Sequence, residues 1–118
     1  MQRGVLPMAL IKGDICLVNF DPFRGGEIGK LRPAIIMSDA AENTILSTVI
    51  VIPLSTVIED NALPYRYPIT KREKLKKKSD ACIYEIRALS KIRIKEKLGQ
   101  LSKNELQSIQ KALCEILG

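Results

Sequence analysis

Short runs of apolar and β-branched residues, separated by turn-forming residues, occupy most of the chain. Residues 15–20 are rich in strand formers and lie between Gly13-Asp14 and Asp21-Pro22, a pattern that predicts a first strand. Residues 33–38 and 45–54 are almost continuously apolar, which predicts two buried central strands. The polar residues 39–43 are expected to connect these two strands.

Weaker strand patterns follow in the second half of the chain. Residues 65–69 alternate, and Pro68 favours an edge position because proline cannot donate a ladder hydrogen bond. Residues 81–86 and 88–94 predict two further strands. The strongly basic residues 70–80, between residues 65–69 and 81–86, are expected to form a solvated loop or a short helix.

The C-terminal segment has the clearest helical pattern. Ser102 and Glu105 have the spacing of a capping box, and Leu101 and Leu106 that of a hydrophobic staple. Apolar residues then recur at helical spacing, which predicts one amphipathic helix over residues 104–117. The apolar stripe consists of Leu106, Ile109, Leu113, Ile116 and Leu117.

Taken together, the elements predict a mainly β fold: a small, strongly curled antiparallel sheet with a C-terminal helix packed on it. Residues 1–118 are expected to form a single domain, in which residues 1–11 are a flexible leader. Residues 21–31 are rich in glycine and charge, and a loop of this length in so small a domain is usually functional.

Composition excludes several kinds of chemistry. The chain of 118 residues contains no histidine, so His-based acid–base catalysis and His-ligated metal sites are excluded. Its three cysteines, Cys16, Cys82 and Cys114, are far apart, which favours free cytosolic thiols over a zinc site or disulfides. The longest apolar run is too short to cross a bilayer. We therefore expect a cytoplasmic protein with no membrane span, no metal and no cofactor.

The net charge of +6 is concentrated in two regions of the chain. Residues 66–78 contain seven basic residues against Glu73, and residues 87–97 contain five against Glu96. Such a surface attracts phosphate backbones, which indicates nucleic-acid binding. For the run of residues 76–78, a solvated lysine surface is the better interpretation. The arginines differ, since a guanidinium grips phosphate with two hydrogen bonds.

An ordered set of motifs gives the chain a family resemblance. Gly13-Asp14-Ile15 is followed by a loop from Asp21-Pro22 to Arg32-Pro33, and then by Pro53-Leu54-Ser55. This order resembles the MazF/PemK family of toxin endoribonucleases, the mRNA interferases. The resemblance implies an SH3-like β-barrel, usually in a homodimer. It also implies metal-independent cleavage of single-stranded RNA and inhibition by a cognate antitoxin, a small acidic protein.

The resemblance also implies three catalytic residues. Arg32 matches the catalytic arginine of the family, and its guanidinium is suited to stabilising the charge of a phosphorane. Ser55 matches a catalytic Thr or Ser at the end of a buried strand. Glu27 matches the acidic loop residue and is the local carboxylate suited to act as a general base. Without the resemblance, Arg32 would be interpreted as a loop anchor bonded to carbonyls, and Ser55 as a turn residue.

Four further residues are assigned to RNA binding: Arg24, Lys30, Thr56 and Arg87. Thr56 is also the alternative to Ser55 if the register slips by one residue. Arg87 matches a basic position of a family strand, although a surface charge explains it almost as well. Asp14 is interpreted as a turn residue before the first strand.

Two other functions compete with the ribonuclease hypothesis. The first is a gyrase poison of the CcdB type, which shares the fold. The absence of tryptophan and the ending Ile116-Leu117-Gly118 argue against it, because that activity resides in a C-terminal Trp-Gly-Ile. The second is a nucleic-acid-binding module without catalytic activity, which the sequence leaves open.

Overall fold

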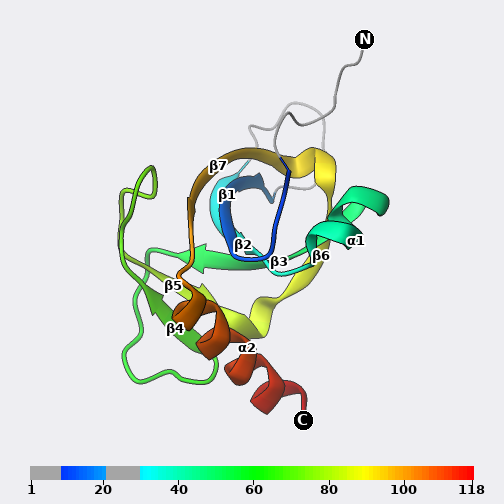
Figure 1. The fold of residues 1–118 in the computed structure, drawn as a ribbon. Coiled ribbons are helices and arrows are strands. Elements are labelled where there is room, and N and C mark those ends of the chain that lie inside the picture. Colours follow the sequence, from blue (N-terminus) through cyan, green and yellow to red (C-terminus); the bar gives the residue numbers. More distant parts are fainter. Residues whose placement is uncertain (1–8, 21–29) are drawn as a thin grey trace.

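In the part of the chain that the structure describes, seven strands form one strongly curled antiparallel sheet (Figure 1). The structure is a computed structural model that describes residues 9–20 and 30–118. The strand order is β4-β5-β3-β2-β1-β7, and β6 pairs with β3. The strands are β1 (Asp14–Asn19), β2 (Leu31–Ile36), β3 (Thr48–Ser55), β4 (Arg66–Ile69), β5 (Ser79–Cys82), β6 (Arg87–Ser90) and β7 (Ile94–Gln100).

Strand β3 is the centre of the sheet because it pairs with three other strands. Along one edge it pairs with β2. Along the other edge its first half pairs with β6 and its last two residues pair with β5. Among the described strands, no ladder joins β4 to β7, so the sheet is open. The predicted small, curled, mainly β fold with a C-terminal helix is confirmed, as an open sheet and not a closed barrel.

Alternation along the strands divides the apolar side chains between two cores. On β2, Ile35 packs in the first core, while its neighbours Ala34 and Ile36 pack in the second. On β3, Ile52 lies in the first core and Val51 in the second. Successive residues of a strand point to opposite faces, and both faces of this sheet are therefore buried over part of its area.

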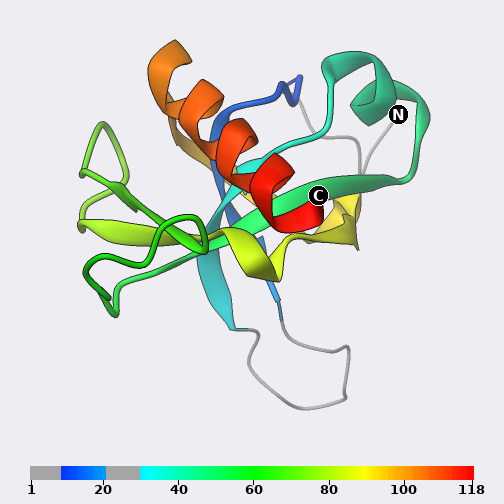
Figure 2. The same ribbon diagram turned by 90° about the horizontal axis from the view of Figure 1, so that it is seen from below.

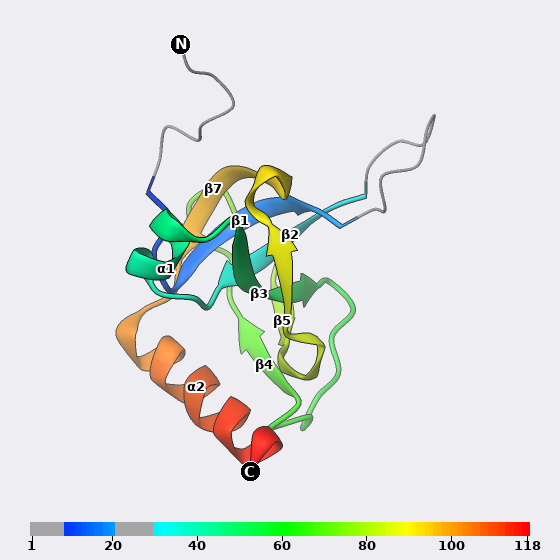
Figure 3. The same cartoon turned by 90° about the vertical axis from the view of Figure 1, so that its right-hand side faces the viewer.

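The first core is covered by α2 (Lys103–Leu117), which lies across one side of the sheet (Figures 2 and 3). The helix begins at Ser102, whose hydroxyl accepts a hydrogen bond from the amide of Glu105, as the predicted capping box requires. Ile109 is fully buried and Ala112 almost so, between the helix and the sheet. The helix predicted from the apolar stripe is confirmed to within one residue.

The Gly13-Asp14 pair has a structural role at the start of β1. Gly13 has φ +96°, a conformation that favours glycine, and its amide donates to the carbonyl of Ile36 at 2.7 Å. Asp14 is completely buried, and its carboxylate accepts hydrogen bonds from the amide of Ile11 and from Gln100 Nε2, both at 3.0 Å. Lys97 Nζ lies 3.2 Å from the same carboxylate. Asp14 thus anchors this turn to β7, away from any catalytic role.

One predicted strand begins too early. Residues 39–45 do not form a polar connection and the start of a strand, because α1 (Ala40–Ile45) occupies this segment and β3 begins only at Thr48. Glu42 Oε1 accepts a hydrogen bond from the amide of Asp39 and so closes the first turn of the helix. The buried Asn43 side chain then bonds to the carbonyls of Leu10 and Ser38.

The prediction of strands over residues 81–86 and 88–94 is wrong in its boundaries. After β5, the 3₁₀ helix η1 (Ile83–Glu85) steps the chain across to β6, since both strands must pair with β3. A second 3₁₀ helix, η2 (Lys91–Arg93), leads into β7, which the sequence pattern missed. Charged residues at positions 95–97 interrupt the apolar pattern of β7.

The basic loop is exposed as predicted, whereas the described end of the predicted leader is partly buried. The basic loop of residues 70–78 carries exposed lysines and contains an isolated bridge between Arg72 and Leu75. Most of the predicted leader, residues 1–8, lies outside the described residues, and Leu10 is buried in the second core. In the described ranges, no helix is both long enough and apolar enough to cross a membrane.

Candidate active site

The register of β2 against β3 brings the Arg32-Pro33 and Pro53-Leu54-Ser55 motifs together. Ala34 is paired with Pro53, and continuing this antiparallel register by two residues sets Arg32 opposite Ser55. Arg32 Nη2 donates a hydrogen bond of 3.0 Å to the carbonyl of Leu54. Two motifs that are more than twenty residues apart in the sequence therefore meet at the end of the central strand.

The described part of the chain places no carboxylate next to the Arg32 side chain. The residue is half-buried, and its guanidinium carbon lies 5.8 Å from the centre of the Phe20 ring. Within residues 9–20 and 30–118, the bond to Leu54 is its single hydrogen bond, and no carboxylate pairs with it. The bond to a carbonyl is the contact expected of a loop anchor, but it uses one of five N–H donors.

Arg87 shares the same aromatic ring. It is the first residue of β6, is paired with Val51 of β3, and its guanidinium carbon lies 4.6 Å from the Phe20 centroid. It is exposed, and the described part of the chain provides it with no carboxylate partner. Two cations against one ring repel each other, and an anion such as phosphate relieves that repulsion.

Ser55 ends β3 and has a defined hydroxyl orientation. Its Oγ accepts a hydrogen bond of 3.1 Å from the amide of Val57. This accepted bond uses only a lone pair, so the O–H of Ser55 remains available to donate a hydrogen bond to a ligand oxygen. Thr56 follows immediately, outside the strand and exposed.

The other residues assigned from the sequence lie at or beyond the edge of this region. Lys30 is exposed, and its carbonyl accepts a hydrogen bond of 3.0 Å from the amide of Phe20. Glu27 and Arg24 lie outside the described residues. The described geometry therefore brings together Arg32, Ser55 and Arg87.

Sequence reasoning missed Phe20, Arg66 and Asp80, which lie on the same face of the sheet. Ser55 is paired with Asp80 across β3 and β5, and Arg66 is paired with Cys82 across β4 and β5. Residues paired across a ladder share a face, so these side chains extend the region around Arg32. We call this surface the arginine face; it consists of Phe20, Arg32, Ser55, Arg66, Asp80, Cys82 and Arg87.

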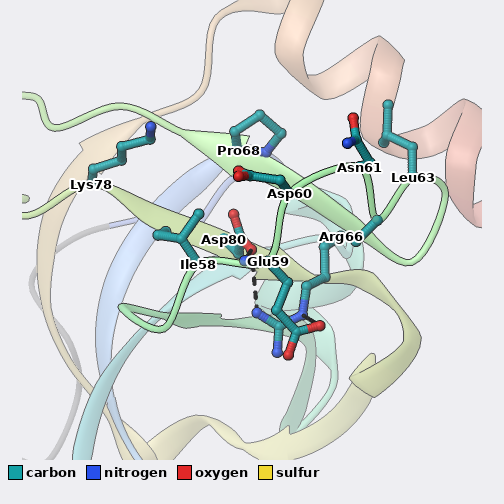
Figure 4. Close-up of a pocket in the computed structure, with 10 residues that line it drawn as sticks. Ile58, Glu59, Asp60, Asn61, Leu63, Arg66, Pro68, Lys78 and Asp80 are labelled. Atoms are coloured by element: carbon teal, nitrogen blue, oxygen red, sulfur yellow. Dashed lines mark hydrogen bonds and ion pairs between the residues drawn. The ribbon is translucent and has the colours of Figure 1, made fainter.

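A buried ion pair organises one end of the arginine face (Figure 4). Asp80 is almost fully buried, and its Oδ2 lies 3.2 Å from Arg66 Nη1. Burial lowers the pKa of Arg66, but the hydrogen bond to Asp80 and nearby negative charges raise the pKa above its ordinary value overall. A buried carboxylate requires such a cation, and the position of Asp80 directly before the apolar residues Ala81–Ile83 is the signal that was available.

A cavity of about 470 Å³ opens beside this pair. Figure 4 shows its wall formed by the segment after β3 on one side and by β4 and β5 on the other. Arg66, Pro68, Lys78 and Asp80 contribute from the strand side. The cavity adjoins the arginine face because Asp80 and Arg66 belong to both.

The thiols of the chain are protonated at neutral pH where they are buried. Burial is the main cause that raises the pKa of Cys16 to about 12, and burial also raises the pKa of Cys82. All three cysteines are free. In the ranges that the structure describes, no group of three or more Cys, Asp or Glu residues is arranged to hold a metal ion.

A family model and a curated relative both match nearly the whole chain. The family model described as the PemK-like, MazF-like toxin of type II toxin–antitoxin systems matches residues 11–117. A relative from Staphylococcus epidermidis, named Endoribonuclease MazF, is 35% identical over 108 residues, which cover 91% of this chain and 90% of the relative.

Solved structures agree with the fold. The MazE–MazF structure from Deinococcus radiodurans (Form-II) superposes with a TM-score of 0.77 at 22% identity, covering 94% of this chain and 97% of the other. The structure of the Mycobacterium tuberculosis toxin MazF-mt6 superposes with a TM-score of 0.74 at 17% identity, covering 88% of this chain and 95% of the other. From the family match, the identity to a curated relative and the meeting of the two motifs, the chain belongs to the PemK-like, MazF-like family of toxins of type II toxin–antitoxin systems.

Proposed function

We propose that this protein is the toxin of a type II toxin–antitoxin system and acts as a metal-independent endoribonuclease on single-stranded RNA, including mRNA. The observation that carries the proposal is the pair Arg32 and Arg87 against Phe20, next to Ser55, with no carboxylate partner in the described part of the chain. The 35% identity to an endoribonuclease supports the same activity. A gyrase poison is disfavoured because the matched family is that of PemK and MazF.

The chain contains the groups that this reaction needs. The ribose 2′-OH attacks the adjacent phosphorus, the bond from phosphorus to the 5′ oxygen breaks, and the leaving 5′ oxygen takes up a proton from solvent. The products therefore carry a 2′,3′-cyclic phosphate and a 5′-OH. The guanidinium of Arg32 stabilises the charge that develops on the phosphoryl oxygens. Ser55 donates a hydrogen bond from its hydroxyl to one of these oxygens, since the same oxygen atom accepts from the amide of Val57 and its O–H remains free to donate.

Proton transfer and RNA binding complete the proposal. Glu27 acts as the general base that accepts the proton of the 2′-OH, a role that suits a carboxylate and not a guanidinium. Arg24, Lys30, Thr56 and Arg87 bind RNA, the cationic ones through its phosphates. Arginine and lysine contacts to phosphate make the affinity depend steeply on salt.

Partners and location follow from the same function. We propose a cognate antitoxin, a small acidic protein that covers the positive surface, as its relatives are found in complexes between toxin and antitoxin. We also propose a homodimer, as the family resemblance implies. An mRNA substrate and three free cysteines fit a cytoplasmic location.

The test is cleavage of a single-stranded RNA by the purified protein in EDTA. We expect fragments with 2′,3′-cyclic phosphate and 5′-OH ends, identified by mass spectrometry, and loss of cutting for Arg32→Ala. Dependence on added divalent metal would refute metal independence. Salt-sensitive binding without any cleavage would identify a nucleic-acid-binding module instead, and capture of gyrase with intact RNA would identify a gyrase poison.

A further inference from the structure

We propose that the Arg66–Asp80 ion pair is a positioning device for Ser55. It holds the segment that follows β3, and through that segment it fixes the hydroxyl of Ser55 in the orientation needed to donate to the phosphate. The proposal rests on the function proposed above for Ser55. Neither Arg66 nor Asp80 needs to touch RNA in this role.

A continuous chain of hydrogen bonds links the ion pair to Ser55. Ser55 Oγ accepts from the amide of Val57 at 3.1 Å, and the carbonyl of Val57 accepts from Arg66 Nη1 at 2.8 Å. The same nitrogen lies 3.2 Å from Asp80 Oδ2. Asp80 Oδ2 also accepts from the amide of Glu59 at 2.9 Å. Two residues of the segment, Val57 and Glu59, are therefore held by one ion pair.

Packing of the apolar side chains of Val57 and Leu63 contributes little to holding this segment in place. Val57 is 64% exposed and Leu63 is 61% exposed, so these side chains bury little area. In the described structure, the segment between β3 and β4 contains no helix or strand. Polar contacts to Arg66 and Asp80 are left as the main restraint on its conformation near Ser55.

The strand side of the network is rigid by comparison. Asp80 has a side-chain exposure of 3%, lies on β5 and is paired with Ser55 in the ladder. Because a buried carboxylate without a cation is strongly destabilised, Asp80 requires Arg66 in place. Because Arg66 must stay beside Asp80, the hydrogen-bond network that leads to Ser55 keeps one arrangement. A positioning role needs such a fixed arrangement.

A second ion pair of the molecule provides a matched control. Arg72 and Glu105 join the basic loop to α2, with side-chain exposures of 18% and 20%. Arg72 Nη2 donates to Glu105 Oε2 at 2.8 Å, and neither residue belongs to the arginine face. Substitution of Arg72 therefore tests what the loss of a comparable ion pair does to stability alone.

The experiment measures kcat and KM for RNA cleavage, and the melting temperature, for Arg66→Met, Asp80→Asn and Arg72→Met. We expect kcat to fall about tenfold or more for Arg66→Met and Asp80→Asn, with KM changed less than about threefold. Arg66→Lys keeps a donor and a charge, so it should recover part of the loss. Arg72→Met should lower the melting temperature and leave kcat of the folded protein unchanged.

A double-mutant cycle with Ser55→Ala separates positioning from stability. In the Ser55→Ala background, Asp80→Asn and Arg66→Met should each change kcat by less than about twofold, because the hydroxyl that the ion pair positions is gone. If Arg66→Met does not fold at the assay temperature, Arg66→Lys takes its place in the cycle. An equal loss of kcat in both backgrounds would overturn the proposal.

Other outcomes would also overturn the proposed positioning role of the Arg66–Asp80 ion pair. Unchanged kcat for both Arg66→Met and Asp80→Asn would show that Ser55 needs no such support. A rise in KM at constant kcat would assign Arg66 to direct RNA contact. If wild-type protein does not cut RNA, or Ser55→Ala cuts it as fast as wild type, the proposed function itself fails, and this is seen before any ion-pair variant is measured.

Discussion

The two faces of the sheet at the end of β3 have different environments and different tasks. On one face, Ile52 and Leu54 are at most 1% exposed, in the core that α2 covers. On the other face, the next residue along the strand, Ser55, lies half-buried among arginines. A single strand thus supplies the core with one residue and the site with its neighbour, because alternate side chains point in opposite directions.

The arginines of the molecule differ in the same way. Arg66 and Arg72 are each bound to a carboxylate, and both anchor loops. Arg32 and Arg87 have no carboxylate partner among the described residues, and both lie against Phe20. The paired Arg66 and Arg72 therefore stabilise the structure, while Arg32 and Arg87 are left with donors for a substrate phosphate.

The largest expected effect is that of Arg32→Ala on catalysis. Removing a guanidinium aimed at the developing negative charge should lower kcat about 10²- to 10³-fold. The melting temperature should change little, since Arg32 makes one hydrogen bond to a carbonyl in the described structure. Single-turnover cleavage of RNA and thermal unfolding measure the two quantities. A large loss of stability with kcat intact would identify Arg32 as a loop anchor.

Two neighbouring substitutions test the contrast between the faces directly. Leu54→Ala leaves a cavity under α2 and should lower the free energy of unfolding by about 2–5 kcal/mol, while the folded fraction keeps its kcat. Ser55→Ala should do the reverse, with kcat lowered about 10- to 100-fold and stability within about 0.5 kcal/mol of wild type. Urea unfolding measures the free energy of unfolding of both variants, and RNA cleavage assays measure their kcat. If the two variants lost stability and kcat to similar extents, the two faces of the sheet would not be functionally separate.

How much of this contrast the sequence predicts depends on the range of the interactions. The helix over residues 103–117 follows from local signals, the Ser102–Glu105 box and the apolar stripe, and its prediction is confirmed. The boundaries of β5, β6 and β7 are set by pairing with β3 and β1, which are distant in sequence, so local patterns placed them wrongly.

The site shows the same limit. Arg32 and Ser55 were found through a family resemblance, and their proximity depends on a register that no local pattern contains. Phe20, Arg66 and Asp80 were missed because each has an ordinary explanation in isolation: an apolar strand end, a surface charge and a turn residue. Only the ladders that join β3, β4 and β5 place Arg66 and Asp80 on one face with Ser55.

A smaller effect is expected from Arg87→Ala. Its guanidinium lies over Phe20 at the exposed edge of the site, so it should contribute binding to a phosphate and little transition-state stabilisation. We expect KM to rise about threefold to tenfold, with kcat nearly unchanged, and the slope of log affinity against log salt to decrease by about 1. RNA binding at several salt concentrations measures the slope. An unchanged slope would place Arg87 outside the phosphate path.

The smallest effect concerns a paired arginine and depends on pH. The hydrogen bond from Arg72 is the main cause that holds the pKa of Glu105 below its ordinary value, and burial opposes it only in part. A lowered pKa in the folded state means that this carboxylate stabilises the protein fully above its ordinary pKa of about 4.3, and that the contribution is lost as pH falls through the folded value.

Glu105→Gln isolates this charge, since the amide oxygen still accepts from the amide of Ser102 and preserves the capping box. At pH 7 we expect the variant to be about 1 kcal/mol less stable than wild type. Urea unfolding at decreasing pH should show the two stabilities converging as the pH falls below the ordinary carboxyl pKa and through the lowered folded-state value, because the wild-type carboxyl then becomes protonated as well. RNA cleavage by the folded variant should equal that of wild type at pH 7. A stability gap that stays constant into acid would show that the pair contributes through packing and not through charge, and a loss of cleavage would extend the site to the far side of the sheet.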